Sequence, residues 1–131
     1  MYKSAKTLYE STDYHNSCYL GGYVIECYQK IVYSLLAPGA PQRIHDLSDL
    51  KKSYKEKVYA FKNSSSLAKL QRLKAVVDID IAFNNIYSSW DPKFRYDDSE
   101  TRWNKATAEK YQKEIKHCKH LISILLINGL I

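Results

Sequence analysis

Apolar positions along this chain recur every three or four residues over long stretches, which is typical of helices that bury one face. The longest stretch, residues 13–37, carries apolar or small side chains at alternating spacings of four and three. It predicts one helix that ends at the Pro38-Gly39-Ala40-Pro41 turn, because proline removes a backbone donor and restricts its neighbour. No strand-like alternation bounded by turn residues is present. The pattern therefore predicts an all-α protein.

The same periodicity predicts four further helices. Their expected spans are residues 4–10, 47–62, 67–87 and a last helix that follows Asn104. Asp46 and Asn104 are expected to cap the third and last helices, and the Asn63–Ser66 turn the fourth, because such side chains accept hydrogen bonds from unpaired backbone N–H groups. Asp78 and Asp80 fall inside the fourth helix, where residues two apart point to different sides.

Length and composition fit one helical domain over residues 1–131. Short connections between long helices predict an up-and-down antiparallel bundle of four to five helices. Hydrophobic residues make up 45% of the chain and charged residues 26%, as in soluble globular proteins. No signal peptide is apparent, and no apolar run approaches the roughly 20 residues that cross a bilayer. Cys18, Cys27 and Cys118 have no CxxC spacing, so we expect reduced thiols and a cytoplasmic protein without membrane association.

The net charge of +6 is concentrated in residues 51–74, which carry eight basic residues against one acidic residue, Glu56. Such a concentration attracts phosphate backbones, because neutralised phosphates release their counterions. The candidate nucleic-acid-binding residues are Lys51, Lys52, Lys55, Lys69, Arg72 and Lys74. The alternative is a solvated lysine face on surface helices, and the sequence leaves both readings open.

The second helix contains a suggestive polar pair. Gly22, Glu26 and Lys30 are spaced four apart and therefore stack along one side. A glycine inside a helix costs about 1 kcal/mol relative to alanine, so Gly21 and Gly22 indicate a close contact with another segment. Glu26 and Lys30 form either an intrahelical ion pair beside that contact or part of a ligand site.

Residues 90–98, Trp-Asp-Pro-Lys-Phe-Arg-Tyr-Asp-Asp, combine aromatic and charged side chains between two helical patterns. Pro92 is expected to keep this stretch out of regular helix. Arg95 presents a planar fork that suits carboxylate or phosphate, and Tyr96 beside it can stack. In the alternative interpretation, Trp90 and Phe94 pack under the bundle, and Arg95 anchors the loop by pairing with Glu26, Asp80 or a backbone carbonyl.

The histidines offer few sites for chemistry. His45 can act as an acid or base near neutral pH, although a hydrogen bond to neighbouring backbone is the preferred reading. His117 and His120 are three residues apart but have no third ligand in helical register, so no metal site is expected. Glycine-rich phosphate loops, nucleophile elbows and zinc-binding motifs are missing, and no cofactor is expected.

Four features, in order along the chain, resemble the HEPN family of small helical-bundle domains. They are the apolar helix around Tyr19–Lys30, His45-Asp46-Leu47 at the start of the third helix, the Phe94-Arg95-Tyr96-Asp97 loop and the apolar last helix. The resemblance implies a bundle of four or five helices, often dimeric, associated in microbes with RNA cleavage, nucleotide handling, toxin–antitoxin and defence systems. It also implies a set of candidate ligand-binding residues: Arg95, Tyr96, Glu26, Lys30 and His45.

One feature of the family's ribonucleases is missing. These enzymes carry an arginine followed by a histidine after four to six intervening residues, and no arginine of this sequence has a histidine at that distance. We therefore expect no catalytic residues and a non-catalytic, homodimeric RNA- or nucleotide-binding module. The alternatives are an interaction partner of a nucleotidyltransferase-like protein and an unconventional ribonuclease with Arg95 on phosphate and His45 as base.

Overall fold

A computed structural model of the chain describes residues 1–38, 44–93 and 101–131. These ranges contain seven helices and no strand, which confirms the all-α prediction. The helices are α1 (Tyr2–Glu10), α2 (Tyr14–Leu36), α3 (Leu47–Ala60), α4 (Ser65–Arg72), α5 (Ile79–Ala82), α6 (Asn84–Ser89) and α7 (Lys105–Ile127).

The predicted helix caps are confirmed. Asp46 accepts a hydrogen bond from the backbone N–H of Asp49, at 3.0 Å, and so starts α3. Ser64 and Asn104 accept the corresponding bonds at the starts of α4 and α7, also at 3.0 Å. Each cap satisfies a backbone donor that has no partner inside the helix.

The prediction of one helix over residues 67–87 is wrong, because the chain leaves the helix after Arg72. Lys74 adopts a left-handed conformation with φ of 57°, and the N–H of Ala75 donates to the carbonyl of Leu70, which closes the end of α4. The hydroxyl of Tyr28 on α2 then donates to the carbonyl of Ala75. This hydrogen bond holds the irregular segment of residues 73–78 against α2, and the short helices α5 and α6 follow that segment.

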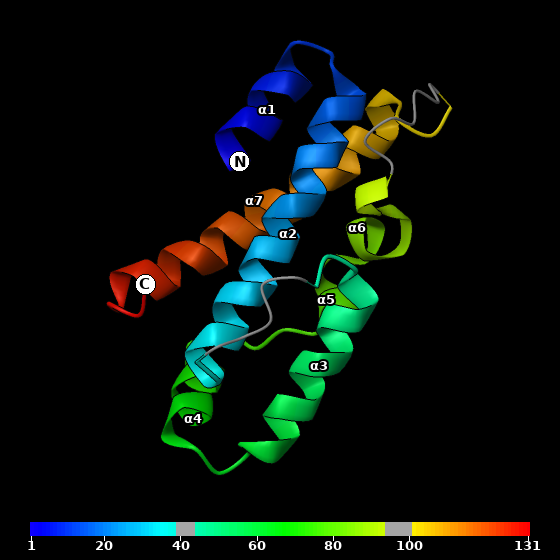
Figure 1. The fold of residues 1–131 in the computed structure, drawn as a ribbon. Coiled ribbons are helices and arrows are strands. Elements are labelled where there is room, and N and C mark those ends of the chain that lie inside the picture. Colours follow the sequence, from blue (N-terminus) through cyan, green and yellow to red (C-terminus); the bar gives the residue numbers. More distant parts are fainter. Residues whose placement is uncertain (39–43, 94–100) are drawn as a thin grey trace.

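Helix α2 runs through the middle of the molecule (Figure 1). It contacts α1 and α7 along its first half and α3 and α4 around its second half. Gln112 of α7 donates to Ser17, and Cys118 of α7 lies near the carbonyl of Val24. The two pairs are separated by 95 and 94 residues, and a constant separation means that α2 and α7 run in the same direction.

The predicted up-and-down antiparallel order therefore holds for α1 against α2 and fails for α2 against α7. It fails for α3 as well, because Glu26 meets His45 and Tyr33 meets Tyr54 in ascending order along both helices. His45, which directly precedes α3, lies beside Glu26 in the middle of α2, so α3 begins near the middle of α2 and runs alongside its second half. The molecule is a helical bundle in which α2, α3 and α7 share one direction.

The core is built from aromatic and aliphatic side chains, and all seven helices contribute to it, α2 and α7 the most. Tyr28, Phe83 and Tyr111 are among its largest fully buried members. Trp90, directly after α6, covers Gly22 of α2, and a Cβ atom on Gly22 would lie 2.0 Å from its ring. The close contact predicted for the glycines is therefore confirmed at Gly22, where a flat indole ring needs the space.

A buried carboxylate fixes α6 to α7. Glu114 of α7 accepts hydrogen bonds from the backbone N–H groups of Asn85 and Ile86, at 3.0 and 2.8 Å. It thereby satisfies the first backbone donors of a short helix that has no side-chain cap of its own. The sequence pattern did not single out Glu114, because its partners lie on another helix.

Candidate functional site

Three of the predicted ligand-binding residues meet at one carboxylate. Glu26 is buried on α2, and its Oε1 atom accepts a hydrogen bond from Lys30 Nζ at 2.7 Å. The same oxygen lies 2.9 Å from Nδ1 of His45, which precedes α3. The other oxygen, Oε2, has no hydrogen-bond partner in the described ranges. The predicted Glu26–Lys30 pair is confirmed, and it includes a histidine from a different segment.

The preferred reading of His45, a bond to neighbouring backbone, is wrong. The imidazole contacts the Glu26 carboxylate instead, while more than half of the side chain stays exposed. When the Glu26 carboxylate is ionised it can only accept hydrogen bonds, and Nδ1 of His45 is then the donor. A neutral ring in this tautomer keeps Nε2 as an acceptor, which is how a carboxylate orients a histidine that acts as a base.

Arg95 and Tyr96, the other two predicted ligand-binding residues, lie outside the described residues. The described part of the same loop starts with Trp90, which is buried and donates from Nε1 to the carbonyl of Tyr19 at 3.0 Å. Its ring also meets the ring of Tyr23 edge to face. The reading of Trp90 as an aromatic that packs against the bundle is confirmed.

Two of the six candidate nucleic-acid-binding residues are paired with carboxylates. Lys51 contacts Asp80 and lies 3.2 Å from Asp78, and Lys55 lies 3.7 Å from Asp78. The prediction that Asp78 and Asp80 point to different sides of a helix is wrong, because residue 78 precedes α5 in an extended conformation. A hydrogen bond to Asp80 raises the pKa of Lys51, and hydrogen bonds with Asp78 and Lys51 lower the pKa of Asp80.

The remaining cations of residues 51–74 are exposed and have no ion pair within the described ranges. This cationic segment comprises Lys52, Lys57, Lys62, Lys69, Arg72 and Lys74, on α3, α4 and the turns after them. It also presents Tyr59, whose side chain is 76% exposed, with Lys62 Nζ 5.4 Å from its ring centroid. Tyr59 was not among the residues predicted to bind a ligand, although its helical register opposite Tyr54 was a signal for exposure.

A cavity of about 320 Å³ lies between α3 and the segment that precedes α5. Val58, Val76 and Val77 form much of its apolar wall, and Gln29 and Tyr54 contribute polar groups. The Tyr54 hydroxyl is buried and has no hydrogen-bond partner among the described residues. Burial raises the pKa of Tyr54, so this hydroxyl stays protonated at neutral pH.

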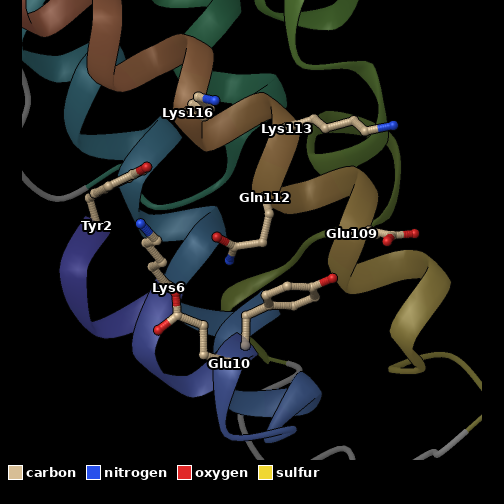
Figure 2. A pocket seen from close by; sticks show the side chains of 8 residues that line it. Tyr2, Lys6, Glu10, Glu109, Gln112, Lys113 and Lys116 are labelled. Carbon is tan, nitrogen blue, oxygen red and sulfur yellow. The ribbon is translucent and has the colours of Figure 1, made fainter.

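Another cavity, of about 290 Å³, lies between α1 and α7 (Figure 2). Figure 2 shows Tyr2, Lys6 and Glu10 on α1 and Gln112 on α7 around this space. Glu109 lies one turn before Gln112 on α7, and Lys113 and Lys116 follow it. A wider hollow of about 560 Å³ continues from it and shares Tyr2, Lys113 and Lys116. We call these two hollows together the α1–α7 groove. The groove was not predictable from the sequence, because it is formed by two helices at opposite ends of the chain.

The cysteines and histidines show no metal-binding arrangement. The described ranges contain no group of three or more His, Cys, Asp or Glu side chains that could hold a metal ion. All three cysteines are free thiols, and burial raises the pKa of Cys18 and of Cys118 to about 12. At neutral pH these two thiols are therefore protonated and poor metal ligands.

No helix in the described ranges is long and apolar enough to cross a membrane. Comparison with known proteins gives no further guide to the site: no family model, no curated protein and no solved structure matches this chain.

Proposed function

We propose that this chain is a HEPN-like, non-catalytic RNA- or nucleotide-binding module of a microbial toxin–antitoxin or defence-type system, and that it prefers single-stranded RNA. The observation that carries the proposal is the cationic segment: six exposed positive charges have no ion pair among the described residues, and one of them, Lys62, lies over the exposed ring of Tyr59. The resemblance of the sequence to the HEPN family supports the same class of function.

The chemistry of the cationic segment suits a single strand better than a duplex. Lysine and arginine side chains attract phosphates, and release of counterions makes such binding depend strongly on salt. An exposed aromatic ring can stack on an unpaired base, which contributes about 1–3 kcal/mol per base. Lys62 lies over Tyr59, so a phosphate next to a stacked base would find a cation within reach.

The test is fluorescence anisotropy with a labelled single-stranded RNA of roughly 20 nucleotides. Lys69 and Arg72 lie three residues apart and share one side of α4. Replacing both by glutamate should weaken binding by about tenfold or more at about 100 mM salt and should flatten the salt dependence. The matched control, Lys105→Glu with Lys110→Glu, changes the net charge equally on α7 and should have a small effect.

Tyr59 separates stacking from charge. Tyr59→Ala should weaken single-strand binding by about 1–3 kcal/mol, while Tyr59→Phe, which keeps the ring, should retain it. A labelled duplex of the same length should be indifferent to both changes. Equal losses in the α4 and α7 double variants would instead mean a response to net charge alone and would reject the cationic segment as the site.

A second candidate function, RNA cleavage, is favoured by the contact between His45 and Glu26. A histidine oriented by a buried carboxylate can take the proton of a ribose 2′-hydroxyl, whose oxygen then attacks the adjacent phosphorus. The P–O5′ bond breaks as the 2′,3′-cyclic phosphate forms, and the departing 5′-oxygen takes a proton from water. New RNA fragments that disappear in both His45→Ala and Glu26→Gln would support this activity. Fragments that persist in both variants would exclude the pair as the base.

The protein-partner alternative is favoured by exposed apolar side chains at the end of α7. Leu126 and Ile127 are 61% and 82% exposed. They offer a contact for a second copy of the chain, as expected for a homodimer, or for a nucleotidyltransferase-like partner. Light scattering on the wild type and on a Leu126→Glu, Ile127→Glu variant tests the dimer, because a charged end should favour the monomer.

A further inference from the structure

The α1–α7 groove is a separate surface from the cationic segment, and its two walls run in opposite directions. Gln112 of α7 approaches the carbonyl of Ala5, while Lys119, two turns further along α7, lies over the ring of Tyr2. The end of α1 is therefore next to the beginning of α7. The start of α1, in turn, lies beside the later part of α7.

The charges of the groove change sign along its length. Glu10 and Glu109 line the cavity at the end where α1 finishes and α7 begins, and Lys6 and Lys113 line it further toward the start of α1. Lys116 and Lys119 line its continuation toward the end of α7, together with His120. The groove is therefore acidic at one end and basic at the other. A phosphate chain laid along the whole groove would meet the two glutamates at one end, whereas the carboxylates of a short peptide segment can lie beside the lysines alone.

Two aromatic side chains of α1 remain partly exposed in the groove. In α1, Ala5 is buried against α2, whereas Tyr2 and Tyr9 are partly exposed and line the groove. Lys119 Nζ lies 4.5 Å from the centroid of the Tyr2 ring, a geometry in which a cation contacts an aromatic face. Two aromatic rings beside lysines offer a complement to side chains that are apolar on one side and acidic on the other.

We propose that the α1–α7 groove binds an amphipathic, acidic helical segment of a partner protein. Its apolar side chains lie against Tyr2 and Tyr9, and its carboxylates lie toward Lys116 and Lys119. An amphipathic helix places such residues three and four positions apart, which suits a groove between two helices. This inference goes beyond RNA binding and does not depend on it, because the residues involved are outside the cationic segment.

The experiment uses fluorescein-labelled peptides of about 18 residues with leucines on one helical face. One peptide carries glutamates on its other face, a second carries lysines there, and a third is a scramble of the first. We expect the glutamate peptide to bind the full chain with a micromolar dissociation constant and the other two to bind at least about tenfold more weakly. Binding weaker than about 1 mM by the glutamate peptide would overturn the proposal.

Lysine-to-glutamate variants test whether the peptide binds in the groove. Lys116→Glu with Lys119→Glu should weaken binding of the glutamate peptide by about tenfold and strengthen binding of the lysine peptide, because the charges that face the peptide are reversed. Both replaced side chains are exposed, so the fold should tolerate the change. Lys52→Glu with Lys69→Glu makes the same charge change on α3 and α4 and should leave both peptides unaffected. Equal effects of the two variants would overturn the proposal.

Competition with single-stranded RNA tests whether the groove binds nucleic acid instead of a protein segment. Under the proposal, RNA does not displace the glutamate peptide, and the Lys116→Glu, Lys119→Glu variant keeps its affinity for RNA. Displacement of the peptide by RNA, together with loss of RNA affinity in that variant, would make the groove a nucleic-acid surface and overturn the assignment to a protein segment. Circular dichroism of each variant confirms that the helices are intact.

Discussion

At the scale of single residues, burial controls the chemistry of the thiols. Cys18 and Cys118 are fully enclosed between α2 and α7, and burial raises the pKa of each to about 12. Cys27 is partly exposed, and its pKa is raised by burial and by the neighbouring Glu26 carboxylate. Since the thiolate is the reactive form, the three cysteines should react with thiol reagents at different rates.

We predict that a thiol reagent near pH 8 modifies one cysteine per native molecule, Cys27, and modifies it more slowly than a free thiol. The other two should react only after unfolding in denaturant. Mass spectrometry after timed quenching counts the modified thiols, and Cys27→Ser should abolish the native reaction. Rapid modification of all three in the native protein would contradict the buried positions of Cys18 and Cys118.

Contacts between single residues were predictable where they are local in sequence. Glu26 and Lys30 are four apart on one helix, so their pairing follows from helical geometry. His45 reaches the same carboxylate from 19 residues away, and this depends on where the segment before α3 returns to α2. The sequence supplied both candidate groups but no measure of their distance.

At the scale of helices, the neighbouring glycines of α2 have different surroundings. A Cβ atom on Gly22 would lie 2.0 Å from the Trp90 ring, whereas one on Gly21 would make ordinary contacts of 3.6 Å with Ile115 and Tyr111. Trp90 has little freedom to move, because it is buried and its Nε1 is hydrogen-bonded to Tyr19. Alanine substitutions at the two positions therefore form a matched pair that differs in the contacts of the added methyl group.

We predict that Gly22→Ala destabilises the protein by about 1–3 kcal/mol or more, because the Trp90 ring must shift. Gly21→Ala should be neutral or stabilising by up to about 1 kcal/mol, because alanine favours the helix and the space is adequate. Urea unfolding of both variants measures the difference. Equal stabilities would mean that the ring moves aside without cost.

The link between α3 and α5 should respond to acid. The pKa of Asp80 is lowered in the folded state by hydrogen bonds with Asp78 and Lys51, so this carboxylate stabilises the fold above its unfolded pKa of about 4. We predict that the stability lost in Asp80→Asn is present at neutral pH and disappears as the pH falls through that region. Urea unfolding at several pH values tests this, with Glu56→Gln on the exposed side of α3 as the control.

Helix positions were largely predictable, because caps and apolar spacing are local signals. The break after Arg72 was not predictable, since residues 73–78 continue the apolar spacing and contain neither glycine nor proline. The hydroxyl of Tyr28, which lies 47 residues earlier, takes the carbonyl of Ala75 and fixes the irregular backbone. A tertiary hydrogen bond thus overrides the local preference for helix.

At the scale of the whole molecule, α2 is the common neighbour. It packs against α1, α3, α4, α6 and α7, so disruption of one pair exposes apolar surface on the others. We predict that the described helices unfold in one cooperative transition, with coincident curves by far-ultraviolet dichroism and tryptophan fluorescence. Separate transitions for the α3–α4 end and the α1–α7 end would show that the two halves of α2 stabilise their neighbours independently.

The shared direction of α2 and α7 has a consequence for how the chain is made. The residues of α7 that cover α2 are synthesised 94 or 95 positions after their partners. At about 5–20 residues per second, the apolar side of α2 therefore waits roughly 5 to 20 seconds for its cover during translation. That interval is when the nascent chain is most exposed to aggregation, and when a ribosome-associated chaperone would have the most to bind.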